Sequence, residues 1–235
     1  MPRIKIYLLF LSLVACTPAF SQMARESAPA PVDSLYREDQ FYLGLTYNFL
    51  VDKPSNITNS GFSGGIHGGF LRDFPINKRR NIAIAIGVGL AYDQFGHNFF
   101  VGAQENNESI FRILDEYVHY DSNRFNMATV QLPIEFRWRS STPTDYQFWR
   151  IYAGLRLGYV YWFQSYFKQA NNKVVKTKID EFNPFRLSAS LAFGYSTFNF
   201  YIAYDFIPWF DKGETMNGEP IDFQSMKVGL IFYIL

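Results

Sequence analysis

The sequence predicts an all-β protein, an antiparallel transmembrane up-and-down β-barrel of about eight strands with both termini in the periplasm. Three observations predict this fold. Apolar residues alternate with period two over segments of about ten residues. The connections between these segments alternate between long and short. Finally, the charged residues of the segments fall on the face opposite to the large apolar side chains.

The segment Ile82–Tyr92 shows the alternation most clearly, since IAIAIGVGLAY places Ile, Val, Leu and Tyr on one face and Ala and Gly on the other. As a helix it would reach only ~16 Å, whereas a tilted strand of ~10 residues crosses the ~30 Å hydrocarbon core. The same alternation predicts further strands at Phe41–Val51, Gly61–Arg72, Met127–Trp138, Phe148–Phe163, Phe185–Tyr195, Phe198–Phe206 and Phe223–Leu235.

The lengths of the connections indicate how the strands are arranged. Long connections are expected at 52–60, 97–126, 164–184 and 207–222, and shorter ones at 74–80, 139–147 and 196–197. Long loops at one end and short turns at the other are typical of an outer-membrane barrel whose termini lie in the periplasm.

The N-terminal residues predict export. A basic start, an apolar stretch and the small-residue site Ala19-Phe-Ser21 indicate a signal peptide over residues 1–21. Leu13-Val-Ala-Cys16 also resembles a lipoprotein box, so lipidation of Cys16 is an alternative. Residues 22–39 are polar and rich in Pro and Ala, and we expect an extended periplasmic tether there. The barrel then occupies residues 40–235.

The predicted strands distinguish a membrane barrel from a soluble one. If the aliphatic face of 82–92 pointed inward, the outer surface would be Ala and Gly without charge, a poor surface for water. With that face in lipid, the charged strand residues line the lumen as a paired network, and a barrel of this size is filled by its own side chains. Glu135 and Arg150 should lie close across one hairpin. The predicted lumen charges are Glu135, Arg137, Arg150, Arg156, Arg186, Asp205 and Lys227.

The chain ends on KVGLIFYIL, an apolar strand with no polar tail. Phe232 and Ile234 are predicted to face lipid. The spacing Lys227-x-Gly229-x-x-Phe232-x-Ile234 resembles the C-terminal signal read by barrel-assembly machinery, here followed by Leu235. We therefore expect that machinery and outer-membrane lipid as partners.

Composition and motifs narrow the functional classes. A net charge of +1 without a basic stripe argues against nucleic-acid binding. Metal and phosphate motifs are absent from the sequence, so we expect no cofactor, no metal and no catalytic residue. A lipid-modifying enzyme would need a His beside a Ser and an acid. His67 lies on an inward strand position, His119 in a long loop, and His97 and Ser109 could meet only through loop folding.

Within the loop 97–126 the alternation stops. Ile110, Ile113, Leu114 and Tyr117 recur at helical spacing, with Phe111 at the margin of the same face. The spacing predicts a short helix, which either folds over the barrel mouth or docks a partner. Its candidate partner-binding residues are Ile110, Phe111, Leu114 and Tyr117.

Five segments stand out by their order and spacing: VDSLYREDQFYLGLTYN, RDFPINKRRNIAI, LPIEFRWRSSTP, FWRIYAGLRLGYVY and the terminal GLIFYIL. Together they resemble the PorT-type barrel proteins of the type IX secretion system. The resemblance implies a non-enzymatic outer-membrane component required for the export of proteins with C-terminal sorting domains, associated with gliding motility and with other type IX components as partners. The alternatives are a lipid-modifying barrel enzyme and a loop-based adhesin or envelope anchor.

Overall fold

The computed structural model describes residues 39–54, 56–103, 109–115, 117–140, 148–211, 214, 218, 220–221 and 223–234. The predicted signal peptide, Cys16 and nearly all of the predicted tether lie outside these residues, so those expectations stay predictions. Within the described ranges, no helix is long and apolar enough to cross a membrane.

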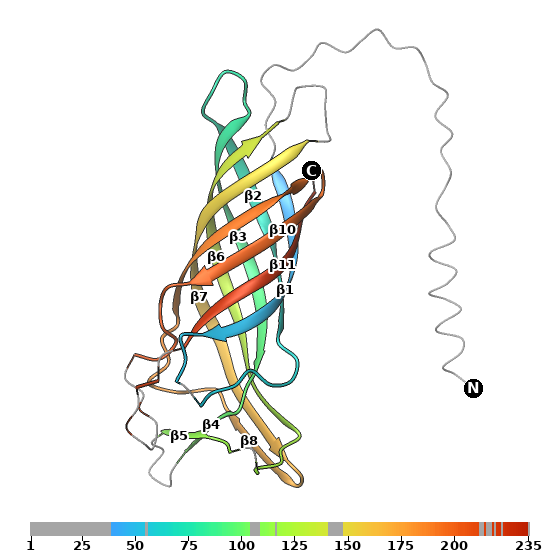
Figure 1. Cartoon of the computed structure of the whole chain (residues 1–235). Coiled ribbons are helices and arrows are strands. Elements are labelled where there is room, and N and C mark those ends of the chain that lie inside the picture. Colours follow the sequence, from blue (N-terminus) through green and yellow to red (C-terminus); the bar gives the residue numbers. More distant parts are fainter. Residues whose placement is uncertain are drawn as a thin grey trace, which may run out of the picture. The chain divides into compact units, whose positions relative to one another are not determined.

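Eight long strands close into one antiparallel barrel (Figure 1). Around the barrel they run in the order β6-β3-β2-β1-β11-β10-β9-β7, and an additional β6–β7 pairing closes the circle. The predicted antiparallel barrel of eight strands is therefore confirmed, and the periplasmic location of its termini stays a prediction. The strands are β1 (Gln40–Val51), β2 (Gly64–Pro75), β3 (Ile82–Gly96), β6 (Ser122–Arg139), β7 (Trp149–Gln169), β9 (Phe185–Tyr195), β10 (Phe198–Asp205) and β11 (Gln224–Ile234).

The two ends of the barrel differ, as the connection lengths predicted. One end carries the short turns and the end of β11, and the other carries the long loops (Figure 1). We call them the short-turn end and the loop end. At the loop end, β4 (Phe99–Ala103) pairs with β5 (Ser109–Ile113), and β8 (Asn172–Lys176) adds to the extended β7.

The helix predicted in the loop 97–126 is wrong. Ser109–Ile113 is strand β5, with Phe111 opposite Val101 in the β4–β5 register. Apolar residues at 110, 111, 113 and 114 fit a helical wheel, but the backbone instead pairs with β4 and sends Phe111 into the core. Strands β3, β6 and β7 also extend beyond their predicted bounds at the loop end, because their hydrogen-bonded ladders continue there with both polar and aromatic residues.

The predicted orientation of the strand faces is confirmed. Along β3, Val88 and Leu90 are 61% and 57% exposed, whereas Ala83 and Ala85 are completely buried. The large aliphatic side chains therefore form the outer surface, where lipid rather than water must cover them. The small side chains face the lumen.

Small residues on β1, β2 and β3 leave room in the lumen for larger side chains. A Cβ atom added at Gly44 would overlap the His67 ring, and one added at Gly89 would overlap the Tyr42 hydroxyl. The glycines on this wall therefore set how closely the polar side chains approach the strands. This explains why the inner phase of β3 is limited to Ala and Gly over most of its length.

We predict that Gly89→Val lowers the yield of folded barrel, because the added methyl groups would displace Tyr42 from a filled lumen. Overpacking of this kind costs ~1–3 kcal/mol. Folding would be measured by the difference in gel migration between unheated and boiled protein. The matched control is Val88→Leu, one residue away on the lipid face, which should fold like the wild type. Equal folding of both variants would show that the lumen has spare room beside Gly89.

Candidate functional site: the lumen and its two ends

Two carboxylates hold three arginines inside the short-turn half of the barrel. Glu135 accepts from Arg137 Nε and from Arg156 Nη2, both at 3.2 Å. Asp73 accepts from Arg137 Nη1 at 3.3 Å and from Arg139 Nη2 at 2.9 Å. All five side chains are buried. The ion pairs join β2, β6 and β7, so they link three strands of the barrel wall through the lumen.

The predicted Glu135–Arg150 pair is wrong. In the β6–β7 register Glu135 faces Gly154, and Arg150 faces Arg139. This register sets Glu135 and Arg150 four residues apart along the strands. Arg150 instead donates from Nη1 to the Ser196 carbonyl oxygen at 2.6 Å and lies 4.4 Å from the centre of the Phe148 ring.

Tyrosine rings pack against Arg156 and Arg137, two of the arginines in the ion-pair network of the short-turn half. The Arg156 guanidinium lies 5.3 Å from the Tyr42 ring centre and 5.1 Å from that of Tyr201. Arg137 lies 4.6 Å from the Tyr152 ring centre. Such cation–π contacts suit the weakly hydrated face of a buried guanidinium. These tyrosines were not among the predicted lumen residues, although each stands in the inward phase of its strand, and that phase is the signal by which they could have been found.

A second group of charges lies nearer the loop end. Lys227 Nζ donates to Asp93 Oδ2 at 2.5 Å, and Asp93 also accepts from Asn48 Nδ2 at 3.0 Å. Asp205 accepts from the hydroxyls of Ser188 and Ser225, both at 2.5 Å.

Arg186, also buried at this level, donates to the carbonyl oxygens of Asn183 at 2.6 Å and Phe185 at 2.7 Å. All seven predicted lumen residues are thus placed inside the barrel wall. Asp73 and Asp93 were missed because each stands one residue past the predicted end of its strand.

An aromatic cluster closes the loop end. Phe125 lies at its centre, with ring centroids of Phe163, Trp209 and Phe223 at 5.3, 6.2 and 6.3 Å. These residues come from β6, β7 and the segment between β10 and β11. The cluster lies between the lumen charges and the long loops. Charged side chains therefore occupy the lumen in the short-turn half and nearer the loop end, and the aromatic cluster occupies the loop end itself.

The predicted partner-binding residues do not form one surface. Phe111 belongs to the aromatic cluster and is 5% exposed, and Leu114 is 7% exposed. Ile110 is half-buried on β5. Tyr117, at 93%, is the exposed member of the set. Strand geometry at Ser109–Ile113 removes the shared helical face on which the docking hypothesis was based.

The three histidines are spread over different environments, and His119 is exposed in the loop that precedes β6. His67 lies in the lumen, with its ring centroid 4.9 Å from that of Tyr201. His97 is completely buried at the loop end, where Nδ1 accepts from the Phe99 amide at 3.1 Å. Ser109 donates to Glu181 Oε2 at 2.9 Å rather than to a histidine. Among the described residues, no group of three or more His, Asp or Glu side chains is placed to hold a metal ion.

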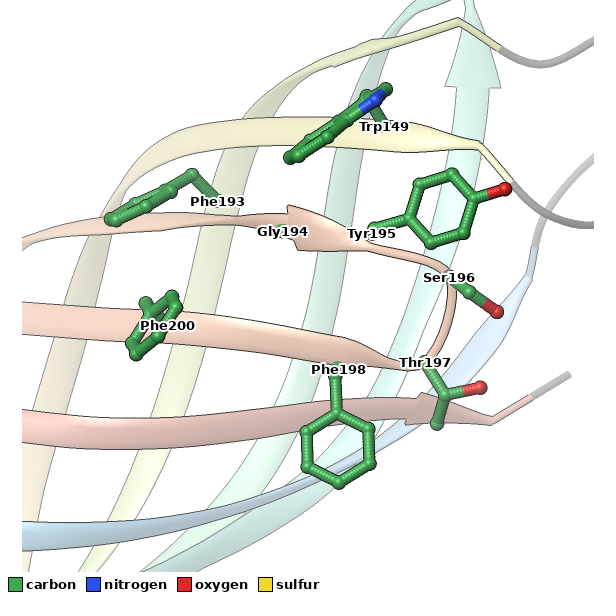
Figure 2. Close-up of a pocket in the computed structure, with 8 residues that line it drawn as sticks. All are labelled: Trp149, Phe193, Gly194, Tyr195, Ser196, Thr197, Phe198 and Phe200. Carbon is green, nitrogen blue, oxygen red and sulfur yellow. The ribbon is translucent and has the colours of Figure 1, made fainter.

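Aromatic side chains also ring the outside of the barrel. Figure 2 shows Trp149, Phe193, Tyr195, Phe198 and Phe200 around the Ser196–Thr197 turn at the short-turn end, where they line an apolar groove. At the loop end, Tyr92 and Trp162 stack with ring centroids 6.3 Å apart. Tyr and Trp gather at the two interfaces of a membrane, so these residues indicate both edges of a lipid-facing band.

The last strand closes the barrel between β1 and β10. Its register sets Phe232 opposite Leu43 on one side and Phe198 on the other, with the Phe198 and Phe232 ring centroids 5.0 Å apart. Ile234 is 52% exposed on the outer surface, and Lys227 points inward. Recognition of Lys227, Gly229, Phe232 and Ile234 as an assembly signal stays a prediction, and Leu235 lies outside the described residues.

A closed barrel with an apolar outer band and two aromatic rims is the architecture of outer-membrane proteins. The family described as "Outer membrane protein beta-barrel domain" matches residues 20–208. The chain belongs to this family. It is an outer-membrane β-barrel protein.

Comparison with curated proteins gives no match for this outer-membrane barrel. Among solved structures, it is similar to the attachment invasion locus protein Ail of Yersinia pestis, solved in complex with the heparin analogue sucrose octasulfate. The sequences are 12% identical, the match covers 85% of this chain and 100% of Ail, and the TM-score is 0.34.

We predict that Glu135→Gln destabilises the barrel by ~3–5 kcal/mol, because it removes the carboxylate that pairs with the buried Arg156, while Arg137 keeps its ion pair with Asp73. Urea unfolding in detergent micelles, followed by tryptophan fluorescence, would measure the loss. The control is Asp121→Asn, which removes the exposed ion pair with Lys168 and should change stability by less than ~1 kcal/mol. Equal effects of the two variants would mean that water reaches Glu135.

His97 predicts a pH dependence. Burial lowers the pKa of His97 from 6.5 to about 3. The folded state therefore holds the neutral ring, and its stabilisation is complete above pH ~6.5 and falls by ~1.4 kcal/mol per pH unit as the pH drops toward 3. His97→Asn keeps a hydrogen-bond acceptor without titrating. Between pH 7.5 and 4.5 the wild type should lose more unfolding free energy than this variant. Equal losses of unfolding free energy in the wild type and in His97→Asn would show that a group other than His97 takes up the proton.

Proposed function

We propose that this outer-membrane barrel is a non-enzymatic accessory component of type IX secretion, needed to export proteins with C-terminal sorting domains and associated with gliding motility. The resemblance of five segments to PorT-type barrels supports this assignment. The observation that carries it is the filled lumen, in which buried ion pairs and the aromatic cluster around Phe125 occupy the described interior. A polypeptide could not pass through such an interior, so the barrel would act beside a translocation path.

A barrel with a filled lumen would contact other secretion components through its rims. At the loop end the exposed Tyr117 is a candidate contact, and at the short-turn end Ile76 is 58% exposed. The barrel-assembly machinery would act earlier, on the terminal strand. A lipid-modifying enzyme and a loop-based adhesin remain the alternatives, and neither gains support from the contacts of His97 and Ser109.

Deletion of the gene tests the proposal. Loss of secreted cargo, with the cargo accumulating in the periplasm, is the expected result, and the wild-type gene should restore secretion. Normal secretion with altered lipid A would instead identify an enzyme. Normal secretion with altered attachment or envelope integrity would identify an adhesin or anchor.

We predict that one rim of the barrel contacts the other secretion components and that the opposite rim does not. The deletion strain would be complemented with Tyr117→Ser at the loop end or with Ile76→Ser at the short-turn end. Both side chains are exposed, so both variants should fold and reach wild-type levels in the outer membrane. One of them should reduce the amount of secreted cargo. If both variants secrete normally at normal barrel levels, neither side chain is the contact.

A further inference from the structure

A group of basic side chains lies on the outer surface at the loop end, and the lumen network does not use it. Beyond the register shift at Ala128/Thr129, odd-numbered residues of β6 and β7 such as Phe125 and Phe163 are buried inside. Arg124 lies opposite Tyr166 in the β6–β7 register, in the other phase from Phe125, and Lys168 shares that phase, so Arg124, Tyr166 and Lys168 point outward. The outward group consists of Arg124 on β6, Tyr166 and Lys168 on β7, and Lys173 on β8, and we call it the basic ledge.

The basic ledge is built around one aromatic ring. The Arg124 guanidinium lies 4.8 Å from the centre of the Tyr166 ring, and Lys173 Nζ lies 5.4 Å from it. The ring thus brings two cations together on one face.

Like charges are also set directly opposite each other. Lys168 faces Lys173 in the β7–β8 register, an arrangement that destabilises a strand pair by itself. One acidic group lies nearby, since Asp121 Oδ2 is 3.5 Å from Lys168 Nζ, but both side chains are about half exposed and such pairs contribute little. The basic ledge therefore has a net positive charge, and binding of an anion would reduce the repulsion between its basic side chains.

The height of the ledge relative to the membrane identifies that anion. The stacked Tyr92 and Trp162 rings lie at the loop-end edge of the lipid-facing band. Tyr166 stands four residues beyond Trp162 on β7, a rise of ~13 Å along the strand and less along the membrane normal, because barrel strands are tilted. At a tilt of about 35–45° the rise along the normal is about 10 Å, a little beyond the headgroup layer of about 5–7 Å. The long stems of Arg124 and the two lysines can reach back to the headgroups.

We propose that the basic ledge binds the phosphate groups of an anionic lipid in the leaflet at the loop end, a phosphorylated glycolipid being the expected class. Arg124 and the two lysines would hold the phosphate oxygens, while Trp162 and Tyr92 contact the acyl chains below. Guanidinium and ammonium groups are the usual partners of phosphate. This site needs only the membrane barrel and is independent of a role in secretion.

The test uses the full chain purified in detergent micelles and titrated with diphosphoryl lipid A, with bound lipid counted by native mass spectrometry. The variant Lys168→Gln/Lys173→Gln should bind about thirtyfold more weakly, because each basic residue near a headgroup contributes about 1 kcal/mol. The matched control is Lys176→Gln/Lys178→Gln, which removes the same charge from the same hairpin segment. Lys176 has the opposite phase on β8 from Lys173. The control should bind like the wild type.

Three outcomes would overturn the proposal. Equal binding by the wild type and the Lys168/Lys173 variant would show that the ledge does not contact lipid. Equal weakening by the control variant would indicate general attraction to a basic hairpin. Binding of a phosphorylated sugar without acyl chains as tightly as lipid A would indicate a soluble polyanion as the ligand. Binding of dephosphorylated lipid A should be weak, and the wild-type affinity should fall as salt is added.

Discussion

The structure depends on one constraint, which is that no backbone polar group can be left unpaired in lipid. The pairing of β6 with β7 meets it by turning an eight-stranded sheet into a closed barrel without an edge. Closure fixes which side of every strand faces lipid and which faces the lumen. A barrel of this size encloses a space that side chains just fill. The charged side chains that point inward therefore lie close together. Pairing offsets the cost of burying them.

The pairing has a definite layout. Asp73 and Glu135 hold arginines from β6 and β7 at the short-turn half, and Asp93 holds Lys227 nearer the loops. Glycines on β1 and β3 make room for His67 and Tyr42. The aromatic cluster then closes the loop end. With the interior occupied in this way, the surfaces left for function are the two rims and the outer wall, and both proposals place function there.

The sequence predicted the strands well because lipid imposes a strict period of two. Along β3 and β6 an error of one residue would have placed charges such as Glu135 in lipid, so the inward charges could be assigned from phase alone. Register across a hairpin follows from turn geometry, which the sequence did not reveal. For this reason the Glu135–Arg150 pair was wrong, although both side chains were correctly assigned to the lumen. The loop helix failed for a different reason: outside the membrane, Phe111 and its neighbours are placed by tertiary packing, and four apolar residues fit either period.

The sealed lumen is the central claim, and planar-bilayer conductance of the purified protein tests it most directly. Ion pairs such as Arg137–Asp73 and the cluster around Phe125 should block ions throughout the described interior. The account therefore predicts no stable current steps above the bilayer background at potentials that leave the membrane intact. Discrete, reproducible conductance steps that require the folded barrel would contradict it.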